Sequence, residues 1–312
     1  MGGDVHDLSY YSKCMMGGIL ACGLTHTAIV PLDVVKCRRQ VFPGMYKSLG
    51  DGLSQLRATE GMGGKGLALG WIPTFIGYSL QGFGKFGFYE IFKDVYKGIV
   101  GEENSVKYRR IGWSISSACA EVIADVLLCP FEAAKVRMQT SKPGTFTTKF
   151  SVAFNSILTN EGSQGLYKGL GPLWARQVPY TIVKFVAFEQ IVELFYTYLL
   201  TRPKSEYSKG QQLGVTFASG YLAGIFCAIV SHPADTMVSK LNSVKGTGTL
   251  GENVSRIYGE IGFKGLWAGL GTRIFMIGTL TGLQWWIYDT FKTSMGLAAS
   301  GGGVTPPKAS KH

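Results

Sequence analysis

One ten-residue pattern occurs three times in this chain at nearly constant spacing. Each copy begins with a proline and carries an acidic residue two positions later: Pro31–Gln40, Pro130–Gln139 and Pro233–Asn242. In the first two copies a lysine follows the acidic residue by three positions, and the prolines lie 99 and then 103 residues apart. Repetition at a fixed period identifies a chain built from similar units, so we predict three related repeats of about 100 residues each.

The composition favours a membrane protein over a soluble one. The 312 residues are 46% hydrophobic and only 16% charged, with 43 glycines and a positive mean hydropathy. Glycine is common where membrane helices pack closely. The net charge of +11 suits attraction to anionic lipid headgroups or to an anionic solute. It does not indicate nucleic-acid binding, because no run of lysine and arginine is long enough.

Each repeat contains two long apolar segments that we predict to be membrane-spanning helices. The six segments are residues 10–35, 66–97, 111–139, 173–200, 211–230 and 274–295. The clearest is Gln211–Val230, which has 20 residues without a charge. The segments 111–139 and 173–200 carry several charges and should score poorly for hydropathy, but the repeat implies that they span as well. Charges in such helices should face the interior of the bundle or a water-filled cavity.

A short amphipathic segment lies between the two spanning segments of each repeat. These segments are residues 50–60, 150–161 and 250–261. The predicted fold class is therefore an all-α membrane protein with six transmembrane helices in three tandem hairpins, related by a pseudo-threefold axis. We place the repeats at residues 1–103, 104–205 and 206–296. We expect residues 297–312 to be a disordered C-terminal tail, because glycines and prolines break regular structure there.

Motifs of other chemical classes are not evident in the sequence. The six cysteines stand singly, mostly in apolar stretches, which favours small buried hydrophobes over disulfides or zinc ligands. A redox or soft-metal role for Cys14 and Cys22 is the alternative. Without a nucleophile–base set, a phosphate-binding glycine loop or a metal cluster, we predict no enzyme activity, no cofactor and no metal. The polar first 12 residues resemble neither a signal peptide nor an arginine-rich transit segment, which favours uncleaved targeting or a mature form.

The repeated pattern resembles the signature of the mitochondrial carrier family, P-x-[DE]-x-x-[KR]-x-[KR] near the matrix end of each odd-numbered helix. The resemblance covers about residues 12–295, and further matching stretches are Thr25–Thr27, Gly84–Glu90, Arg176–Thr181, Ser231–Asp235 and Ile277–Thr281. It implies six tilted helices around a central pathway in the mitochondrial inner membrane, with the three short helices on the matrix side. It also implies transport of phosphate, binding of anionic lipids such as cardiolipin, and a monomer that is sufficient for transport.

The acidic residues of the repeated pattern are predicted to form a gate at the matrix end of the pathway. A proline inside a helix removes a backbone hydrogen bond and kinks the helix, so the three odd helices can bend inward together. The predicted gate consists of three acids, two lysines and two glutamines that can hydrogen-bond beneath the pairs: Asp33, Glu132, Asp235, Lys36, Lys135, Gln40 and Gln139. In the third copy Val238 takes the place of the lysine, so this gate lacks one base.

A second gate is predicted at the cytoplasmic end, where an acid follows an aromatic residue near the end of each returning helix. Its members are Glu90, Lys93, Glu189, Asp289 and Lys292. Glu193 stands where the second repeat should supply a base, so this gate also lacks one. A buried ion pair adds little net stability because desolvation opposes the attraction, which suits a gate that opens repeatedly. Exposed pairs on solvated helix faces are the alternative.

Polar residues between the two gates are candidate ligands for a small oxyanion. Such an ion needs convergent cationic groups together with hydroxyl or amide donors in a low-dielectric site. Aligning the returning helices places Lys85, Lys184 and Gln284 at equivalent positions. The full set of candidate substrate-binding residues is Thr74, Tyr78, Gln81, Lys85, Arg176, Gln177, Tyr180, Lys184, Arg273 and Gln284.

Titratable residues of the odd helices are candidates for proton coupling. His26 precedes Asp33 by two helical turns, and Glu121, Asp125 and Glu132 share one helix face. Unpaired acids inside a membrane favour the neutral form, so these could carry protons near neutral pH. His26 titrates in the same range; a structural role is the alternative for it, and is the role we favour for His232.

The sequence thus predicts a secondary transporter that imports phosphate with a proton, or equivalently exchanges it for hydroxide. Substrate would bind near the midplane, and access would alternate between the two gates. One alternative is a carrier of the same fold for another small anion, such as a dicarboxylate. The others are an uncoupling or channel-like protein and a membrane-embedded enzyme or import receptor.

Overall fold

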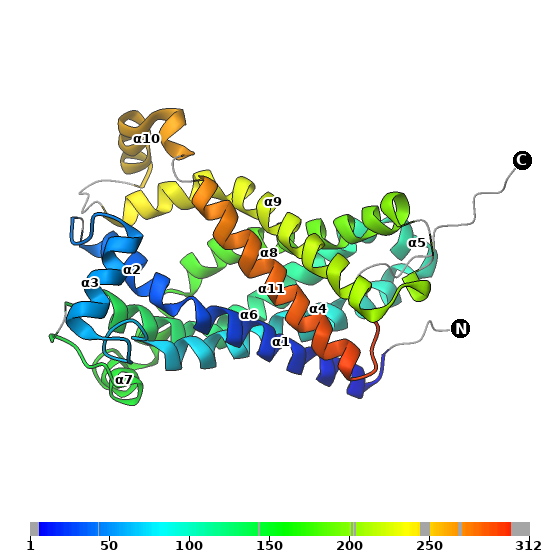
Figure 1. Cartoon of the computed structure of the whole chain (residues 1–312), viewed down its shortest axis with the longest axis horizontal. Coiled ribbons are helices and arrows are strands. Elements are labelled where there is room, and N and C mark those ends of the chain that lie inside the picture. The colour runs from blue at the N-terminus through cyan, green and yellow to red at the C-terminus, as the bar shows by residue number, and fades with distance from the viewer. Residues whose placement is uncertain are drawn as a thin grey trace, which may run out of the picture.

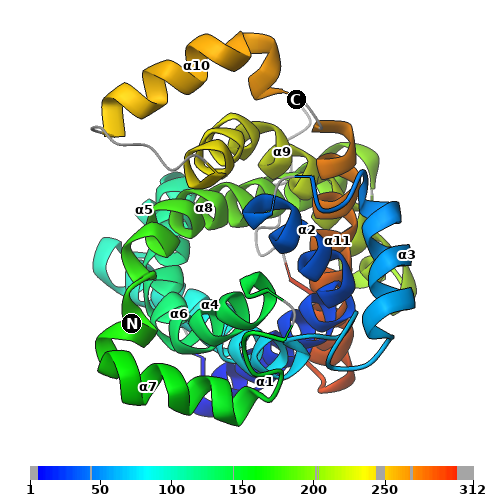
Figure 2. The ribbon, with the colours of Figure 1, turned by 90° about the vertical axis from the view of Figure 1, so that its left-hand side faces the viewer.

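The computed structural model describes residues 6–42, 44–142, 144–200, 202, 204–243, 250–267 and 270–300. Every regular element in these residues is helical, so the predicted all-α fold is confirmed. The long elements are α1 (Leu8–Ala28) with α2 (Val30–Val41), α4 (Trp71–Val100), α6 (Arg109–Thr140), α8 (Leu170–Leu194), α9 (Lys209–Ser243) and α11 (Leu270–Ser294). Figure 2 shows them as a ring, and they contact one another in the order α1, α4, α6, α8, α9, α11 and back to α1. Each predicted hairpin therefore contributes two neighbouring helices of the ring.

Three shorter helices lie together at one end of the ring. They are α3 (Leu49–Glu60), α7 (Phe150–Tyr167) and α10 (Leu250–Leu266), at the left of Figure 1. The start of α1, the end of α11 and the short α5 (Glu102–Lys107) lie at the right. We call these the three-helix end and the α5 end. The predicted amphipathic segments are thus helices, although α7 and α10 continue beyond residues 161 and 261, each turning at a glycine with positive φ (68° at Gly162, 61° at Gly262).

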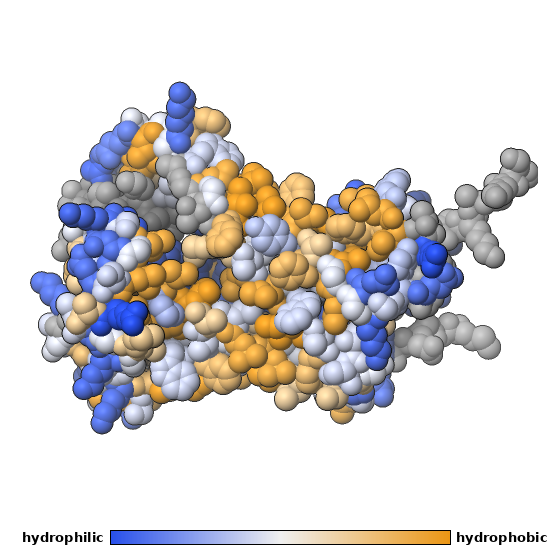
Figure 3. Space-filling view, viewed as in Figure 1, coloured by the Kyte–Doolittle hydropathy of each residue, from blue (hydrophilic) through white to orange (hydrophobic). Residues whose placement is uncertain are grey.

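An apolar band crosses the waist of the molecule on the face drawn in Figure 3. Figure 3 shows hydrophobic surface along the middle of this face and hydrophilic side chains toward both ends. By length and composition α6 and α9 could each cross a membrane, and the bent pair α1–α2 makes a third candidate. The prediction that residues 111–139 would score poorly was wrong, because the charges of α6 gather near its ends and leave only Glu121 and Asp125 in its middle. Within the described residues α4, α8 and α11 do not pass the same test.

The three repeated prolines do not act alike. Pro31 lies in the first turn of α2, after a break at Ile29 that bends the first odd helix by 56°. The helices α6 and α9 instead continue through Pro130 and Pro233. The predicted kink thus takes the form of a helix break in the first repeat, and the joint inward bending of the three odd helices stays a prediction.

Small residues allow the two helices of a hairpin to touch through their backbones. A Cβ atom added to Gly18 of α1 would lie 2.1 Å from the carbonyl oxygen of Gly82 on α4, and the reverse holds for Gly82. In the third repeat, a Cβ on Gly220 of α9 would lie 3.1 Å from the Cα of Gly282 on α11. Membrane helices use small residues for such close crossings.

The C-terminal tail expected to be disordered from residue 297 is ordered for its first four residues. The N–H of Leu297 donates to the carbonyl of Lys292 at 2.9 Å, and Ala299 and Ser300 are buried. We call residues 297–300 the C-terminal strap. Residues 301–312 lie outside the described part of the chain.

Candidate functional site

Six aromatic side chains meet where α4, α8 and α11 face one another inside the ring. Each helix contributes two at equivalent positions of the repeat: Phe86 and Tyr89, Phe185 and Phe188, Trp285 and Tyr288. The ring centroids of Phe86, Phe185 and Trp285 lie 5.2–5.5 Å from one another, so three helices from three repeats touch at one level. Aromatic pairs favour such offset and edge contacts. We call this cluster the aromatic plug.

Three buried polar residues lie next to the plug, each one position before a plug residue in the sequence. They are the predicted equivalent residues Lys85, Lys184 and Gln284, all less than 5% exposed. Lys184 donates from its Nζ to the Oε1 atom of Gln284 at 2.5 Å. The Nζ of Lys85 does not join them directly but lies 2.9 Å from Oε2 of Glu121 on α6.

The acids of α6 are engaged by α4, which corrects the expectation that they are unpaired. Glu121 forms the ion pair with Lys85, and the amide nitrogen of Gln81 donates to Oε1 of Glu121 at 3.0 Å and to Oδ1 of Asp125 at 3.1 Å. Gln81 was expected to bind substrate. Both acids are fully buried. The two faces meet because α4 and α6 pack closely at Gly84, where an added Cβ would lie 3.1 Å from the Cα of Ala124.

The predicted proton-coupling histidine contacts the substrate-binding candidates. The ring of His26 stacks on that of Tyr78, with centroids 3.8 Å apart and planes 12° apart. Its Nδ1 atom lies 2.9 Å from the carbonyl oxygen of Cys22 and 3.3 Å from the amide nitrogen of Gln284. That amide nitrogen also donates to the hydroxyl of Thr25 at 3.3 Å. One chain of contacts therefore joins His26, Gln284 and Lys184.

Five of the ten substrate-binding candidates take part in the contacts described above: Tyr78, Gln81, Lys85, Lys184 and Gln284. The other five do not. The hydroxyl of Thr74 donates to the carbonyl of Gly70 at 2.7 Å, so its proton is used within α4. The guanidinium of Arg273 donates to the hydroxyl of Ser231 at 2.9 Å. The remaining three lie one to two turns along α8 from Lys184; Tyr180 and Gln177 are half-buried and Arg176 is exposed.

Toward the three-helix end, one lysine joins two repeats. The Nζ of Lys135 lies 3.0 Å from Oδ2 of Asp33 and 3.6 Å from Oε2 of Glu132. Lys36 is exposed and has no ion pair among the described side chains. The expected hydrogen bond of Gln139 beneath the pair is absent, because its amide donates to the carbonyl of Leu69 at 3.0 Å. The side chains of Gln40 and Asp235 lie outside the described residues.

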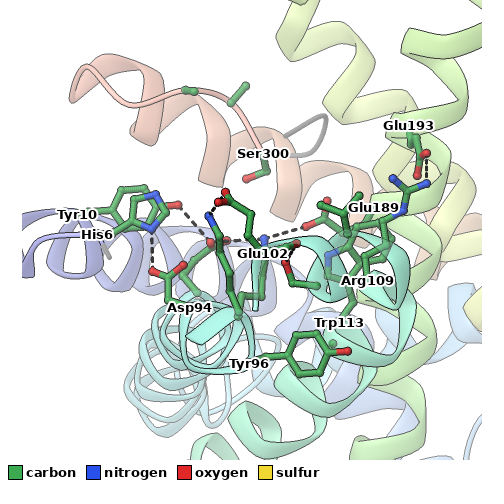
Figure 4. Close-up of a pocket in the computed structure, with 18 of the residues that line it drawn as sticks. His6, Tyr10, Asp94, Tyr96, Glu102, Arg109, Trp113, Glu189, Glu193 and Ser300 are labelled. Carbon is green, nitrogen blue, oxygen red and sulfur yellow. Dashed lines mark hydrogen bonds and ion pairs between the residues drawn. The ribbon is translucent and has the colours of Figure 1, made fainter. Parts of the chain in front are cut away.

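Toward the α5 end, a second lysine joins two repeats at a cavity of about 450 Å³ (Figure 4). The Nζ of Lys93 lies 3.5 Å from Oε2 of Glu90 and 3.4 Å from Oε1 of Glu189. The hydroxyl of Tyr10 also donates to Glu90, at 3.1 Å. Three of the five residues predicted for this gate are thus linked in one network.

The other two residues of this predicted gate, Asp289 and Lys292, are bound by the C-terminal strap. Asp289 accepts through Oδ2 from the hydroxyl of Thr216 at 2.7 Å and from the N–H of Ser300 at 2.9 Å. Lys292 donates to the hydroxyl of Ser300 at 3.2 Å and has no ion pair among the described side chains. Glu193, which replaces the expected base, pairs with Arg109 of α6.

Sequence reasoning missed both Ser300 and Arg109, since neither belongs to the repeated pattern. The only sequence signal was the unbalanced charge of Glu193, which requires a base from elsewhere once it is partly buried. The described residues contain no group of three or more side chains that could hold a metal ion.

Comparison with known proteins places these features in context. The family model described as mitochondrial carrier protein matches residues 7–99, 111–199 and 209–298. The chain is 55% identical to a probable mitochondrial phosphate carrier protein of Schizosaccharomyces pombe, over 94% of this chain and 93% of the relative. It is 54% identical to a mitochondrial phosphate carrier protein of Caenorhabditis elegans, over 92% and 82% of the two chains. Identity to solute carrier family 25 member 3 of Homo sapiens is 52%, over 91% and 76%.

Proposed function

The chain belongs to the mitochondrial carrier family, and on that basis we propose that it carries inorganic phosphate across the mitochondrial inner membrane into the matrix, together with a proton. It is a transporter and not an enzyme. In this reading the three-helix end faces the matrix and the α5 end faces the cytoplasmic side. The pathway runs through the ring of six helices in Figure 2, so one chain encloses it and would suffice for transport. The net charge of +11 is consistent with bound anionic lipid such as cardiolipin.

The main structural support for proton coupling is the buried ion pair of Lys85 and Glu121. A phosphate ion in this part of the ring needs the lysine as a charged hydrogen-bond donor. In the observed state that donor is bound to Glu121 at 2.9 Å, and both side chains are removed from water. Phosphate must therefore compete with a carboxylate for the same ammonium group.

A proton on Glu121 removes this competition. The neutral carboxyl group no longer attracts the ammonium strongly, and Lys85 becomes available to the anion. When the proton leaves, the carboxylate takes the lysine back and phosphate is released. Phosphate and proton thus bind together and leave together. Because the proton offsets one negative charge of phosphate, their joint movement is opposed less by the membrane potential.

Alternating access would use the two charged networks and the plug. The aromatic plug and the network of Lys93 close the α5 end, while Lys135 and Asp33 join two repeats at the three-helix end. A buried ion pair is nearly balanced between desolvation and attraction, so it can break and re-form during each cycle. The transported ions would bind between these closures, near Lys85 and Lys184.

Reconstitution of the purified protein in liposomes tests this function. Phosphate uptake should follow an imposed pH gradient, inside alkaline, and should stop when an ionophore collapses the gradient. Malate and other dicarboxylates should neither enter nor compete at comparable concentrations. Uptake that continues unchanged after collapse would rule out proton coupling, and preferential uptake of a dicarboxylate would rule out phosphate as the substrate.

A further inference from the structure

Gln284 lies between Lys184 and His26. Its Oε1 atom accepts from Nζ of Lys184 at 2.5 Å, and its amide nitrogen lies 3.3 Å from Nδ1 of His26. All three residues come from different helices, α8, α11 and α1, and Gln284 is only 2% exposed. A movement of this amide therefore changes its contacts with both neighbours.

The chemistry of Lys184 fixes which way the amide points. An ammonium group only donates hydrogen bonds, so the oxygen of Gln284 must face Lys184 and the NH₂ group must face His26. The NH₂ group can bond to Nδ1 of His26 only while that atom keeps its lone pair.

The Nδ1 atom of His26 has two competing partners. The carbonyl oxygen of Cys22, 2.9 Å away, requires a hydrogen on Nδ1, whereas the amide of Gln284 requires a lone pair there. Neutral His26 with its hydrogen on Nε2 can accept from Gln284. Once Nδ1 is protonated, it donates to Cys22 and presents an N–H to the NH₂ group of Gln284. Two donors then oppose each other, and the amide is pushed away from His26.

We propose that Gln284 is the positioning residue that transmits protonation of His26 to Lys184. The inference rests on the proposed function and extends it to a second lysine. While His26 is neutral and carries its hydrogen on Nε2, the amide bonds to both Nδ1 and the hydroxyl of Thr25, and its oxygen occupies Lys184. When Nδ1 takes a proton, the amide keeps only the hydroxyl of Thr25 as an acceptor, its oxygen leaves Lys184, and the lysine is free to bind phosphate. Glu121 masks Lys85 and Gln284 masks Lys184, so both lysines become available only when Glu121 and His26 are both protonated. Two protons carried with HPO₄²⁻ are equivalent to one proton carried with H₂PO₄⁻.

The surroundings of His26 allow this switch. The charged groups facing it are Asp33 of α2, Lys135 of α6 and Lys184 of α8, while Tyr78 of α4 covers one face of the ring. Asp33 and Lys135 are paired with each other at 3.0 Å, so their fields largely cancel at the ring. Lys184 is the unbalanced charge, and its binding of phosphate would favour the protonated histidine in return, as linkage requires.

The test compares Gln284→Met, which keeps the side-chain length but removes the amide, with the wild-type carrier. Phosphate–phosphate exchange is measured in liposomes with equal pH on both sides, at a series of values between about pH 6 and about pH 8. The ratio of half-saturating phosphate concentrations, variant to wild type, cancels the titration of phosphate itself. This ratio should change by about 5-fold or more across the range, because Lys184 is no longer masked at high pH. A ratio that stays constant overturns the proposal.

Two further variants separate the switch from simple loss of packing. Gln284→Glu has the same shape but holds Lys184 in an ion pair, so it should weaken phosphate binding at every pH; wild-type affinity would contradict the proposal. Gln212→Met removes an amide that donates to the carbonyls of Lys204 and Tyr207 near the α5 end, and should keep the wild-type pH profile. A flattened profile in Gln212→Met would also contradict the proposal. Failure of the wild-type carrier to couple phosphate to protons would instead refute the proposed function.

Discussion

The rings of Phe188 and Trp285 stack face to face, with centroids 3.5 Å apart and planes within 2° of each other. This contact joins α8 of the second repeat to α11 of the third, where the repeated pattern of acid and base is incomplete because Glu193 replaces a base. The proposed closure of the α5 end would therefore not depend on ion pairs alone. Lys85 and Lys184 are only 4% and 3% exposed beside these apolar rings, so they lie in a low-dielectric environment.

Removing the largest ring of the plug should open this closure. Trp285 is 1% exposed, so Trp285→Ala should lower the free energy of unfolding by about 3–5 kcal/mol and let small ions leak across liposomes. The adjacent Trp286, which is 42% exposed, provides the matched control. Thermal unfolding in detergent and proton leak in liposomes check both effects. Equal results for Trp285→Ala and Trp286→Ala would argue against a closing role for the plug.

Neutralising Glu121 should uncouple the carrier. Glu121→Gln mimics the protonated acid permanently and leaves Lys85 free, so phosphate–phosphate exchange should persist. Accumulation driven by a one-unit pH gradient, which one proton per phosphate can sustain at about tenfold, should fall toward equality. Glu161→Gln, which removes the exposed partner of Arg137 on α7, should accumulate phosphate normally. Wild-type accumulation by Glu121→Gln would exclude this carboxyl group from coupling.

Lys184 should be required for phosphate transport. Lys184→Met keeps the length of the side chain but removes its charge, and the lost charged hydrogen bonds should reduce exchange about 10- to 100-fold. Lys65→Met, in the exposed turn before α4, is the matched control and should retain activity. Initial rates of labelled phosphate exchange measure both variants. Unaltered transport by Lys184→Met would remove this lysine from the binding site.

Truncation should separate the C-terminal strap from the residues after it. A chain ending at Gly296 lacks Ser300, whose N–H donates to Asp289 and whose hydroxyl accepts from Lys292. These two buried charged groups would then have fewer hydrogen bonds. Its stability should fall by about 1–3 kcal/mol in thermal unfolding. A chain ending at Ser300 keeps these contacts and should match the full-length protein. If both truncations unfold alike, the strap contributes no measurable stability.

The glycine contact within the first hairpin should not tolerate a methyl group. Gly82→Ala places a Cβ 2.1 Å from the carbonyl oxygen of Gly18, so α1 and α4 must separate and the folded yield should fall sharply. Gly98→Ala, near the end of the same helix, meets no atom within 4 Å and should behave like the wild type. Size-exclusion profiles and unfolding temperatures provide the comparison, and a well-folded Gly82→Ala would show that the crossing can relax.

The threefold pattern predicted most of the architecture, because equivalent segments of three repeats must fold alike. It could not predict the pair of Lys85 and Glu121. A repeat identifies equivalent residues, but it does not determine which faces of α4 and α6 meet, and here that is set by the contact of Gly84 with Ala124. Alignment therefore assigned Lys85 to the substrate and left the acids of α6 unpaired. The pattern also could not predict the contacts of residues outside it, such as Arg109 with Glu193 and Ser300 with Asp289.

The backbone contacts of Gly18 with Gly82 and of Gly220 with Gly282 have a mechanical consequence. Close-packed contacts between main chains resist sliding, so we expect α1 with α4, and α9 with α11, each to move as one unit. The close approach of Gly84 to Ala124 extends the first unit to α6. The remaining joints lie between α6 and α8, between α8 and α9, and between α11 and α1, and α8 itself carries Lys184 and an internal proline, Pro179. A transporter assembled from three similar repeats would then move as three unequal units.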